Sequence, residues 1–98
     1  MTVVGVDVGG TKIKSGRVLG TKVEQTGCSM VVKNDSLENS LSKLYDTIGE
    51  VMTESVAAIG VGVPAVVDTD SGVVFDVQNI PSWKKVPLKQ LLQDRFNV

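Results

Sequence analysis

The sequence predicts an α/β fold with a mixed β-sheet, in which an antiparallel β-meander comes first and a crossover helix follows. Three observations predict it. Valine-rich runs separated by glycine-containing turns open the chain, and valine fills nineteen of its 98 positions. A stretch of helical period comes next, and another β-branched run follows it. Strands with tight connections pair antiparallel, whereas a strand reached through a long crossover pairs parallel.

Three strands make up the predicted meander. Residues 3–8 are almost wholly apolar and stop at two glycines, which predicts a short strand buried on both faces. Residues 11–19 form a second strand with a more solvated character, because lysines and an arginine lie along it. A turn signal at residues 19–22 leads into a third strand that continues to residue 32. The short connections make these strands sequential neighbours in the sheet.

The next segment has the period of an amphipathic helix that continues to about Glu54. Asp35 and Ser36 stand where an N-cap is expected, and Glu38, three residues after Asp35, completes a capping-box pattern. Apolar residues then recur every three or four positions and mark one buried face: Leu37, Leu41, Leu44, Tyr45, Ile48, Val51 and Met52.

The second half of the chain predicts one more core strand, a hairpin and a short helix. The strand covers residues 57–63, and its long connection to the meander favours parallel pairing. Residues 66–67 and 73–75 flank a turn that ends in glycine, which predicts the hairpin. A proline-punctuated loop over residues 78–83 precedes a helix that opens at residues 87–88. We find no internal repeat and no domain linker.

Composition and charge exclude several classes of function. Ten basic against eleven acidic residues give a formal net charge of −1, so nothing favours binding to nucleic acid or to a membrane surface. The absence of histidine removes Ser-His-Asp and Cys-His nucleophile systems within these residues. Cys28 has no second cysteine to pair with and is expected to be a small core residue. No stretch resembles a signal peptide or a membrane span, and we expect a cytoplasmic protein.

Residues 7–12, with the sequence DVGGTK, concentrate the chemical signal. A carboxylate ends a strand, two glycines let the backbone N–H groups approach an anion, and a hydroxyl and an ammonium follow. These are the groups that bind a nucleotide phosphate tail and its Mg²⁺. A Walker A loop is excluded because a strand follows instead of a helix. The alternative is an ordinary hairpin turn with a solvated Asp7 and Lys12.

Two weaker features leave alternatives open. Trp83 lies in the proline-punctuated loop, where its ring either stacks on a sugar or anchors the loop to the core. Asp68 and Asp70 lie in the hairpin turn, and we interpret them as turn residues that accept hydrogen bonds from their own backbone instead of as cation ligands.

Two blocks of this sequence resemble the ROK family of bacterial sugar kinases and repressors. Residues 4–12, VGVDVGGTK, are similar to the family's opening phosphate motif. Residues 59–68, 71–74, 79–83 and 86–88 are similar, in order and spacing, to its second conserved stretch. The resemblance covers residues 3–98 and implies an actin-like ATPase, ribonuclease H-like fold. It also implies ATP-dependent phosphorylation of a hexose or amino-sugar hydroxyl, as in glucokinases.

The resemblance implies roles for nine residues. Asp7 would organise Mg²⁺, through water, and the ATP phosphates would be approached by Gly9, Gly10, Thr11 and Lys12. Backbone groups of two residues would border the sugar, and two further side chains would bind its hydroxyls: Ala65 and Val66, then Gln78 and Asn79. Many relatives have Pro-Gly where this chain has Pro64-Ala65.

The family's general-base aspartate, in an Asn-Asp pair, is expected beyond Val98, so we expect no catalytic base within this chain. Residues 1–98 are therefore interpreted as the N-terminal portion of an actin-like sugar-kinase domain that lacks the C-terminal domain and is inactive alone. A homodimer of the full-length protein is compatible with this interpretation. So is a structural zinc site downstream.

Two alternatives to a kinase remain open. The first is a sugar-binding transcriptional regulator of the same family, although such repressors commonly lose the D-x-G-G-T-K motif that this chain keeps. The second is a free-standing small domain with a structural or assembly role. The resemblance does not identify which sugar is bound.

Overall fold

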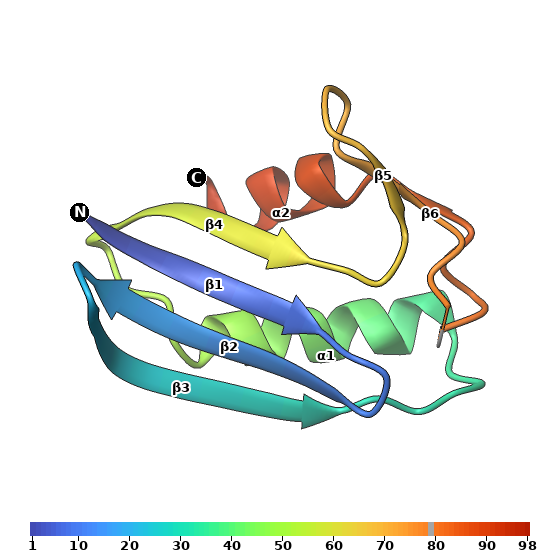
Figure 1. The fold of residues 1–98 in the computed structure, drawn as a ribbon, viewed down its shortest axis with the longest axis horizontal. Coiled ribbons are helices and arrows are strands. Elements are labelled where there is room, and N and C mark those ends of the chain that lie inside the picture. The colour runs from blue at the N-terminus through green and yellow to red at the C-terminus, as the bar shows by residue number, and fades with distance from the viewer. Residues whose placement is uncertain (79) are drawn as a thin grey trace.

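The computed structural model describes residues 1–78 and 80–98. A four-stranded sheet contains β1 (Thr2–Val8), β2 (Lys12–Leu19), β3 (Lys22–Met30) and β4 (Val56–Gly62), in the order β3-β2-β1-β4 (Figure 1). β1 pairs antiparallel with β2 and parallel with β4, and β2 pairs antiparallel with β3. The predicted mixed sheet, with its meander and its crossover, is confirmed. The third strand ends at Met30, two residues earlier than expected.

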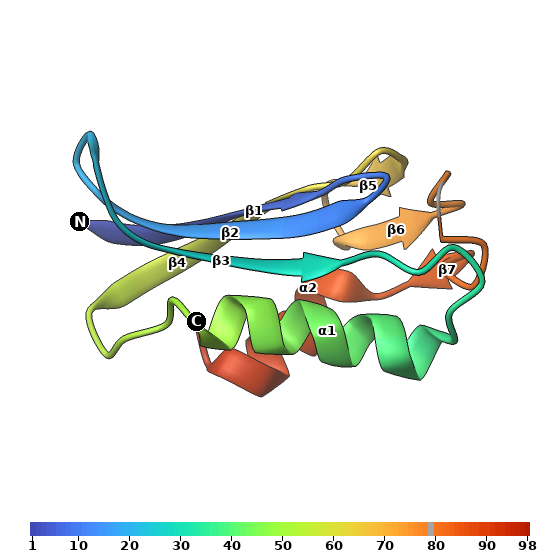
Figure 2. The same ribbon diagram turned by 90° about the horizontal axis from the view of Figure 1, so that it is seen from below.

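One face of this sheet carries the core and the other is open. Along β1 the side chains of Val4, Val6 and Val8 are buried, whereas Gly5 and Asp7 are exposed. Figure 2 shows both helices on the same side of the sheet. Within the described part of the chain no element covers the face that bears Asp7. The prediction of a first strand buried on both faces is therefore wrong, because a hydropathy pattern does not reveal how many faces are covered.

α1 (Leu37–Gly49) crosses the sheet between β3 and β4, as its period predicted. Its N-cap is Ser36, whose Oγ accepts from the backbone N–H of Asn39, so the capping box built on Asp35 and Glu38 does not form. The helix ends at Gly49, about one turn before the predicted end. Val51 lies beyond it yet is fully buried, because the segment after the helix folds back onto the core.

A second sheet, which the sequence did not predict as separate, contains three short strands. β5 (Val66–Asp68) and β6 (Val73–Phe75) form the expected hairpin, and β7 (Lys85–Val86) adds to β6. The two-residue β7 was not predicted, because so short a strand has no period of its own. α2 (Leu88–Phe96) then packs beside α1.

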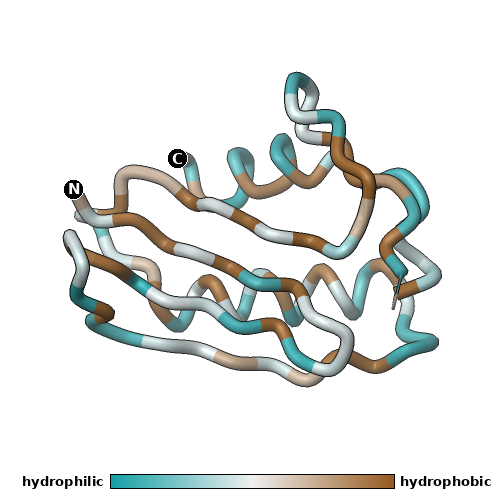
Figure 3. The backbone as a smooth tube through the Cα atoms, in the orientation of Figure 1, coloured by the Kyte–Doolittle hydropathy of each residue, from teal (hydrophilic) through white to brown (hydrophobic). Residues whose placement is uncertain are grey.

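The two helices meet through aromatic residues. The rings of Tyr45 and Phe96 pack edge to face with their centroids 6.3 Å apart, and the Arg95 guanidinium lies 5.1 Å from the centre of the Tyr45 ring. Figure 3 shows hydrophobic residues concentrated on β1 and β4, with a more polar β3 at the sheet edge. Buried hydrophobic residues from both sheets and both helices form one cluster: Val4, Val6, Val8, Ile13, Leu44, Ile48, Val51, Val56, Val74, Val77, Ile80, Trp83, Val86, Leu88 and Leu92.

Cys28 is exposed, contrary to expectation. It lies on β3 opposite Lys14, and Lys14 lies opposite Asp7 on β1. All three residues are exposed and share the uncovered face of the sheet. The exposure of Cys28 is therefore set by the uncovered face of the sheet on which it lies, and not by the general preference of cysteine for the core.

Candidate functional site

The tip of the first hairpin, residues 9–12, joins β1 to β2 and is held by backbone hydrogen bonds on both sides. The Gly9 N–H donates to the Lys12 carbonyl oxygen at 2.8 Å, and the Val31 N–H donates to the Thr11 carbonyl oxygen at 2.8 Å. The first bond closes the turn, and the second ties it to the segment that follows β3. Backbone hydrogen bonds within the turn and to the segment after β3 therefore fix its position.

The same tip presents free donors to solvent. Among the described residues, the backbone N–H groups of Gly10 and Thr11 have no hydrogen-bond partner in the protein. Gly10, Thr11 and Lys12 are all exposed. Two adjacent N–H groups, a hydroxyl and an ammonium at one fixed turn form a set of donors suited to the oxygens of a phosphate.

Asp7 lies at the end of β1 with two lysines on its face. The strand register pairs Asp7 with Lys14 on β2, and Lys12 is two residues from Lys14 on the same strand. Because side chains alternate along a strand, Lys12 and Lys14 share the open face with Asp7. Lys14 was not predicted as a site residue. The alternation along residues 12–14 is the sequence signal that would have found it, once the register with β1 was known.

The donor set around Asp7 fits Mg²⁺ bound mainly through water. Among the described residues, no three acidic, histidine or cysteine side chains cluster as a metal cage. Mg²⁺ keeps several waters and is commonly bound by one or two carboxylates together with substrate phosphates. An exposed carboxylate beside a turn with free N–H donors meets that requirement.

A second group of predicted residues comes together through the backbone. The Gln78 N–H donates to the Pro64 carbonyl oxygen at 3.5 Å, which places Gln78 against the turn that leads to Ala65 and Val66. Ala65 is half-buried, and Val66 is 72% exposed. Asn79, the fourth predicted sugar contact, lies outside the described residues.

Both groups lie at the same end of the four-stranded sheet. β1 and β4 are parallel, so the hairpin after β1 and the 63–66 segment after β4 leave the sheet at its shared carboxyl edge (Figure 1). Asp7 pairs directly with Gly62, the last residue of β4. Crevices outside the carboxyl ends of parallel strands are the usual ligand sites of α/β sheets.

Trp83 anchors the loop that carries Gln78. Its side chain is fully buried, and its Nε1 donates to the Ser40 Oγ on α1 at 2.6 Å. Of the two interpretations of this ring, stacking on a sugar is therefore wrong and anchoring is confirmed. Ser40 had no signal in the sequence, because its partner is 43 residues away.

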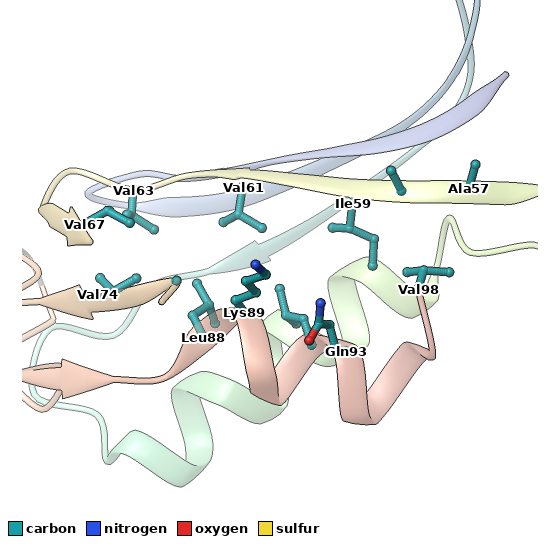
Figure 4. A pocket seen from close by; sticks show the side chains of 13 residues that line it. Ala57, Ile59, Val61, Val63, Val67, Val74, Leu88, Lys89, Gln93 and Val98 are labelled. Atoms are coloured by element: carbon teal, nitrogen blue, oxygen red, sulfur yellow. The ribbon is translucent and has the colours of Figure 1, made fainter. Parts of the chain in front are cut away.

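A pocket of about 340 Å³ lies between β4 and α2, and its lining includes Val63 and Val67, which flank Ala65 and Val66 in the sequence. Figure 4 shows Ile59, Val61 and Val63 above it, with Leu88 and Lys89 below. Its lining is mostly apolar and includes none of the nine predicted site residues. The free N–H donors and the charged groups of the candidate site lie at the first hairpin, outside this pocket.

The turn of the second hairpin bears out the interpretation of Asp68. Asp68 Oδ1 accepts from the backbone N–H groups of Asp70 and Ser71, at 3.1 and 3.4 Å. The Asp68 carboxylate therefore stabilises its own turn.

Comparison with known proteins identifies the family. The sequence profile of the ROK family matches residues 3–98. The chain belongs to the ROK family. Both blocks of the predicted resemblance lie within the matched range, and this prediction is confirmed.

Two curated relatives show that family members of different function match this chain. A glucokinase of Thermotoga maritima is 32% identical over 98 residues, covering 97% of this chain and 31% of the relative. A xylose repressor of Caldicellulosiruptor bescii is 27% identical over 105 residues, covering 99% of this chain and 26% of the relative. This chain thus spans about a third or less of the length of these relatives.

A solved structure confirms the fold. A ROK family glucokinase from Streptomyces griseus, in complex with glucose and AMPPNP, matches with a TM-score of 0.86 at 26% identity. The match covers 100% of this chain and 31% of that one. The predicted actin-like ATPase fold is therefore confirmed for this chain. In the described part of the chain, no helix has the length and apolar character needed to cross a bilayer.

Proposed function

We propose that this chain supplies the phosphate-binding hairpin and the sugar-facing loop of an ATP-dependent sugar kinase of the glucokinase type. The reaction transfers the γ-phosphoryl group of ATP to a hexose or amino-sugar hydroxyl. The observation that supports it is the fixed 9–12 turn, with its free N–H groups and neighbouring Asp7, at the same sheet end as Ala65 and Gln78. Phosphoryl transfer depends mainly on positioning and charge stabilisation, which such groups supply.

Each predicted residue has a defined task in this proposal. The N–H groups at Gly10 and Thr11, the Thr11 hydroxyl and the Lys12 ammonium bind the ATP phosphates, and Gly9 lets the turn close. Asp7 holds Mg²⁺ through water, and the bound ion neutralises phosphate charge. The backbone at Ala65 and Val66 borders the sugar, and the side chains of Gln78 and Asn79 accept or donate hydrogen bonds to its hydroxyls.

These residues supply one side of a reaction site. None of them is placed to remove a proton from a sugar hydroxyl, and we propose that a general-base aspartate lies outside residues 1–98. On this proposal the chain is the N-terminal portion of the kinase domain, is inactive alone and works in the cytoplasm, where ATP is present. The full-length protein would bind sugar and ATP, and neither nucleic acid nor membrane.

The xylose repressor relative favours a second candidate, a sugar-binding regulator without catalysis. The two candidates differ at the hairpin. A regulator has no need for free N–H donors and a carboxylate beside them. This chain keeps all six residues of the DVGGTK motif, and Asp7, Gly10, Thr11 and Lys12 are exposed around the hydrogen-bonded turn.

The test is a coupled assay of ADP formation on the polypeptide that the complete native reading frame encodes, hereafter the complete protein. Glucose, mannose and N-acetylmannosamine serve as substrates with MgATP. The exposed Asp7→Asn variant should lower kcat/KM by about 10²- to 10³-fold, because it removes a charge that acts on the transferring phosphoryl group.

Asp70→Asn is the matched control, since Asp70 is also exposed but lies in the β5–β6 turn. It should keep the unmodified kcat/KM. Hexose binding without any ADP formation would reject the kinase and favour the regulator.

A further inference from the structure

We propose that Trp83 and Ser40 are positioning residues for the sugar, an inference that rests on the proposed function. The hydrogen bond between them fixes the described residues of the loop, 76–78 and 80–84, on α1. It thereby sets where Gln78 meets a sugar hydroxyl. Neither residue touches the sugar in this proposal, and both act through the loop.

The hydrogen bond between Trp83 and Ser40 is buried from solvent and has a suitable donor and acceptor. Trp83 is fully buried and Ser40 is 4% exposed, and Nε1 lies 2.6 Å from Oγ. The Ser40 hydroxyl donates to the carbonyl oxygen of Ser36 at 2.8 Å, so its lone pair is free to accept from the indole. Indole N–H is only a donor, and a buried donor without a partner is unfavourable. The loop therefore has one preferred position on α1.

Hydrogen bonds of the Trp83 backbone constrain the position of Gln78. The Trp83 N–H donates to the Ile80 carbonyl oxygen at 2.9 Å, and the Trp83 carbonyl oxygen accepts from the Val77 N–H at 3.0 Å. The side chains of Val77 and Ile80 are buried on either side of Gln78. Gln78 itself is held to Pro64 by a hydrogen bond at 3.5 Å, near the outer limit for such bonds. Its position therefore depends mainly on its neighbours and, through them, on Trp83.

The loop also begins in a conformation that needs support. Asp76 has a φ of 50°, in the left-handed region, and its N–H donates to the Lys84 carbonyl oxygen at 3.0 Å. A non-glycine residue stays in this region only when its surroundings hold it there. Lys84 follows Trp83 directly, so the anchor and the strained start of the loop are adjacent across the loop base.

The experiment measures the KM for hexose, the KM for MgATP and kcat in the complete protein. Trp83→Phe keeps an aromatic ring and removes the N–H, whereas Ser40→Ala keeps the indole and removes its acceptor. Each should raise the hexose KM about three- to tenfold, since fewer molecules hold the loop in its binding conformation. The KM for MgATP should stay within about twofold, because the hydrogen bonds that hold the 9–12 turn come from Gly9 and Val31 and not from the Trp83 loop. The double variant should be no worse than either single one.

Ser15→Ala is the matched control for general loosening. Ser15 is also buried, and its Oγ donates to the Thr47 carbonyl oxygen on α1 at 2.7 Å, so its hydrogen bond joins β2 and not the loop to α1. It should lower the melting temperature and leave the hexose KM unchanged. An equal rise in hexose KM for Ser15→Ala would overturn the proposal, as would no rise for Trp83→Phe and Ser40→Ala.

The outcomes distinguish failure of the positioning role from failure of the proposed kinase function. If the unmodified protein phosphorylates no hexose, the proposed function fails and this inference fails with it. If the unmodified protein is active and the two variants keep its hexose KM, only the positioning role is wrong. Should Trp83→Phe not fold, Ser40→Ala decides, because it leaves the buried ring in place.

Discussion

Gly9 and Lys12 face each other so closely across the first hairpin that a Cβ atom at position 9 would lie 2.9 Å from the Lys12 carbonyl oxygen. The Gly9 N–H donates to that same oxygen at 2.8 Å. Because the opposing atom belongs to the backbone, it cannot swing aside as a flexible side chain would. Glycine is therefore required at position 9 by lack of space, and the turn that presents the free N–H groups depends on it.

Gly9→Ala should therefore disturb the hairpin and with it the proposed binding of ATP phosphates. We expect kcat/KM for MgATP to fall about 10- to 100-fold in the complete protein, because donors displaced by a fraction of an ångström no longer match the phosphate oxygens. Gly5→Ala is the control, since Gly5 lies on β1, the strand that leads into the turn, and an added Cβ atom there would have nothing within 4 Å. Unchanged MgATP kinetics in Gly9→Ala would show that the turn does not bind phosphate.

Gly27 is required for a different reason, the close approach of β3 to α1. A Cβ atom there would lie 2.7 Å from the Ser15 Oγ and 2.9 Å from the Thr47 carbonyl oxygen, which are hydrogen-bonded to each other. Gly27→Ala should destabilise the protein by about 1–3 kcal/mol through overpacking, measured by urea unfolding. Gly16→Ala, whose nearest contacts are at 3.9 Å, should stay within about 0.5 kcal/mol. If Gly27→Ala and Gly16→Ala changed the free energy of unfolding equally, β3 and α1 would not be closely packed at Gly27.

Local rules explain how much of the fold was predictable. The meander, α1 and the parallel return of β4 follow from period, turn residues and connection length, which act over a few positions. The N-cap was misplaced by one residue because Asp35 and Ser36 are both good capping residues, and only the backbone decides between them. The open face of β1 and the exposure of Cys28 depend on which elements cover the sheet, which no local pattern records.

The candidate site divides in the same way. Asp7 to Lys12 could be found because their chemistry is contiguous in the sequence. Lys14 required the register of β1 with β2, and the meeting of Gln78 with Pro64 required the path of the whole loop. The roles of these residues toward ATP and sugar stay predictions.

Asp35 and Lys43 predict a pH dependence of stability. Lys43 Nζ lies 2.9 Å from Asp35 Oδ2, and this hydrogen bond is the main cause that lowers the pKa of Asp35 below its ordinary 3.8. A carboxyl whose pKa is lower in the folded state stabilises the fold above its unfolded pKa. That contribution is lost as the pH falls through the folded pKa.

Asp35→Asn should therefore reduce the loss of unfolding free energy that occurs as the pH falls through 3.8 and below, followed by urea unfolding at several pH values. Lys43→Met should reduce it similarly, because it removes the partner of the carboxylate. If both variants keep the unmodified pH profile, the ion pair does not contribute to stability.

Gly72 ends the β5–β6 turn and lies against the start of α2. Both its backbone conformation and the space around it require glycine. Its φ is +69°, and a Cβ atom there would lie 2.1 Å from the Lys89 Cβ, while the Lys89 N–H donates to its carbonyl oxygen at 3.2 Å. The Lys89 Cβ is fixed to the helix backbone and cannot move away by rotation. Any side chain at position 72 must therefore push the hairpin off the helix.

Gly72→Ala should lower the free energy of unfolding by about 2–4 kcal/mol, the sum of a left-handed backbone penalty and overpacking. Gly20→Ala separates the two terms, because Gly20 has a φ of +63° but nothing within 4 Å of an added Cβ. It should lose only about 1–2 kcal/mol. Chemical denaturation of both variants measures the two losses of unfolding free energy. Equal losses would mean that Gly72 does not pack closely against α2.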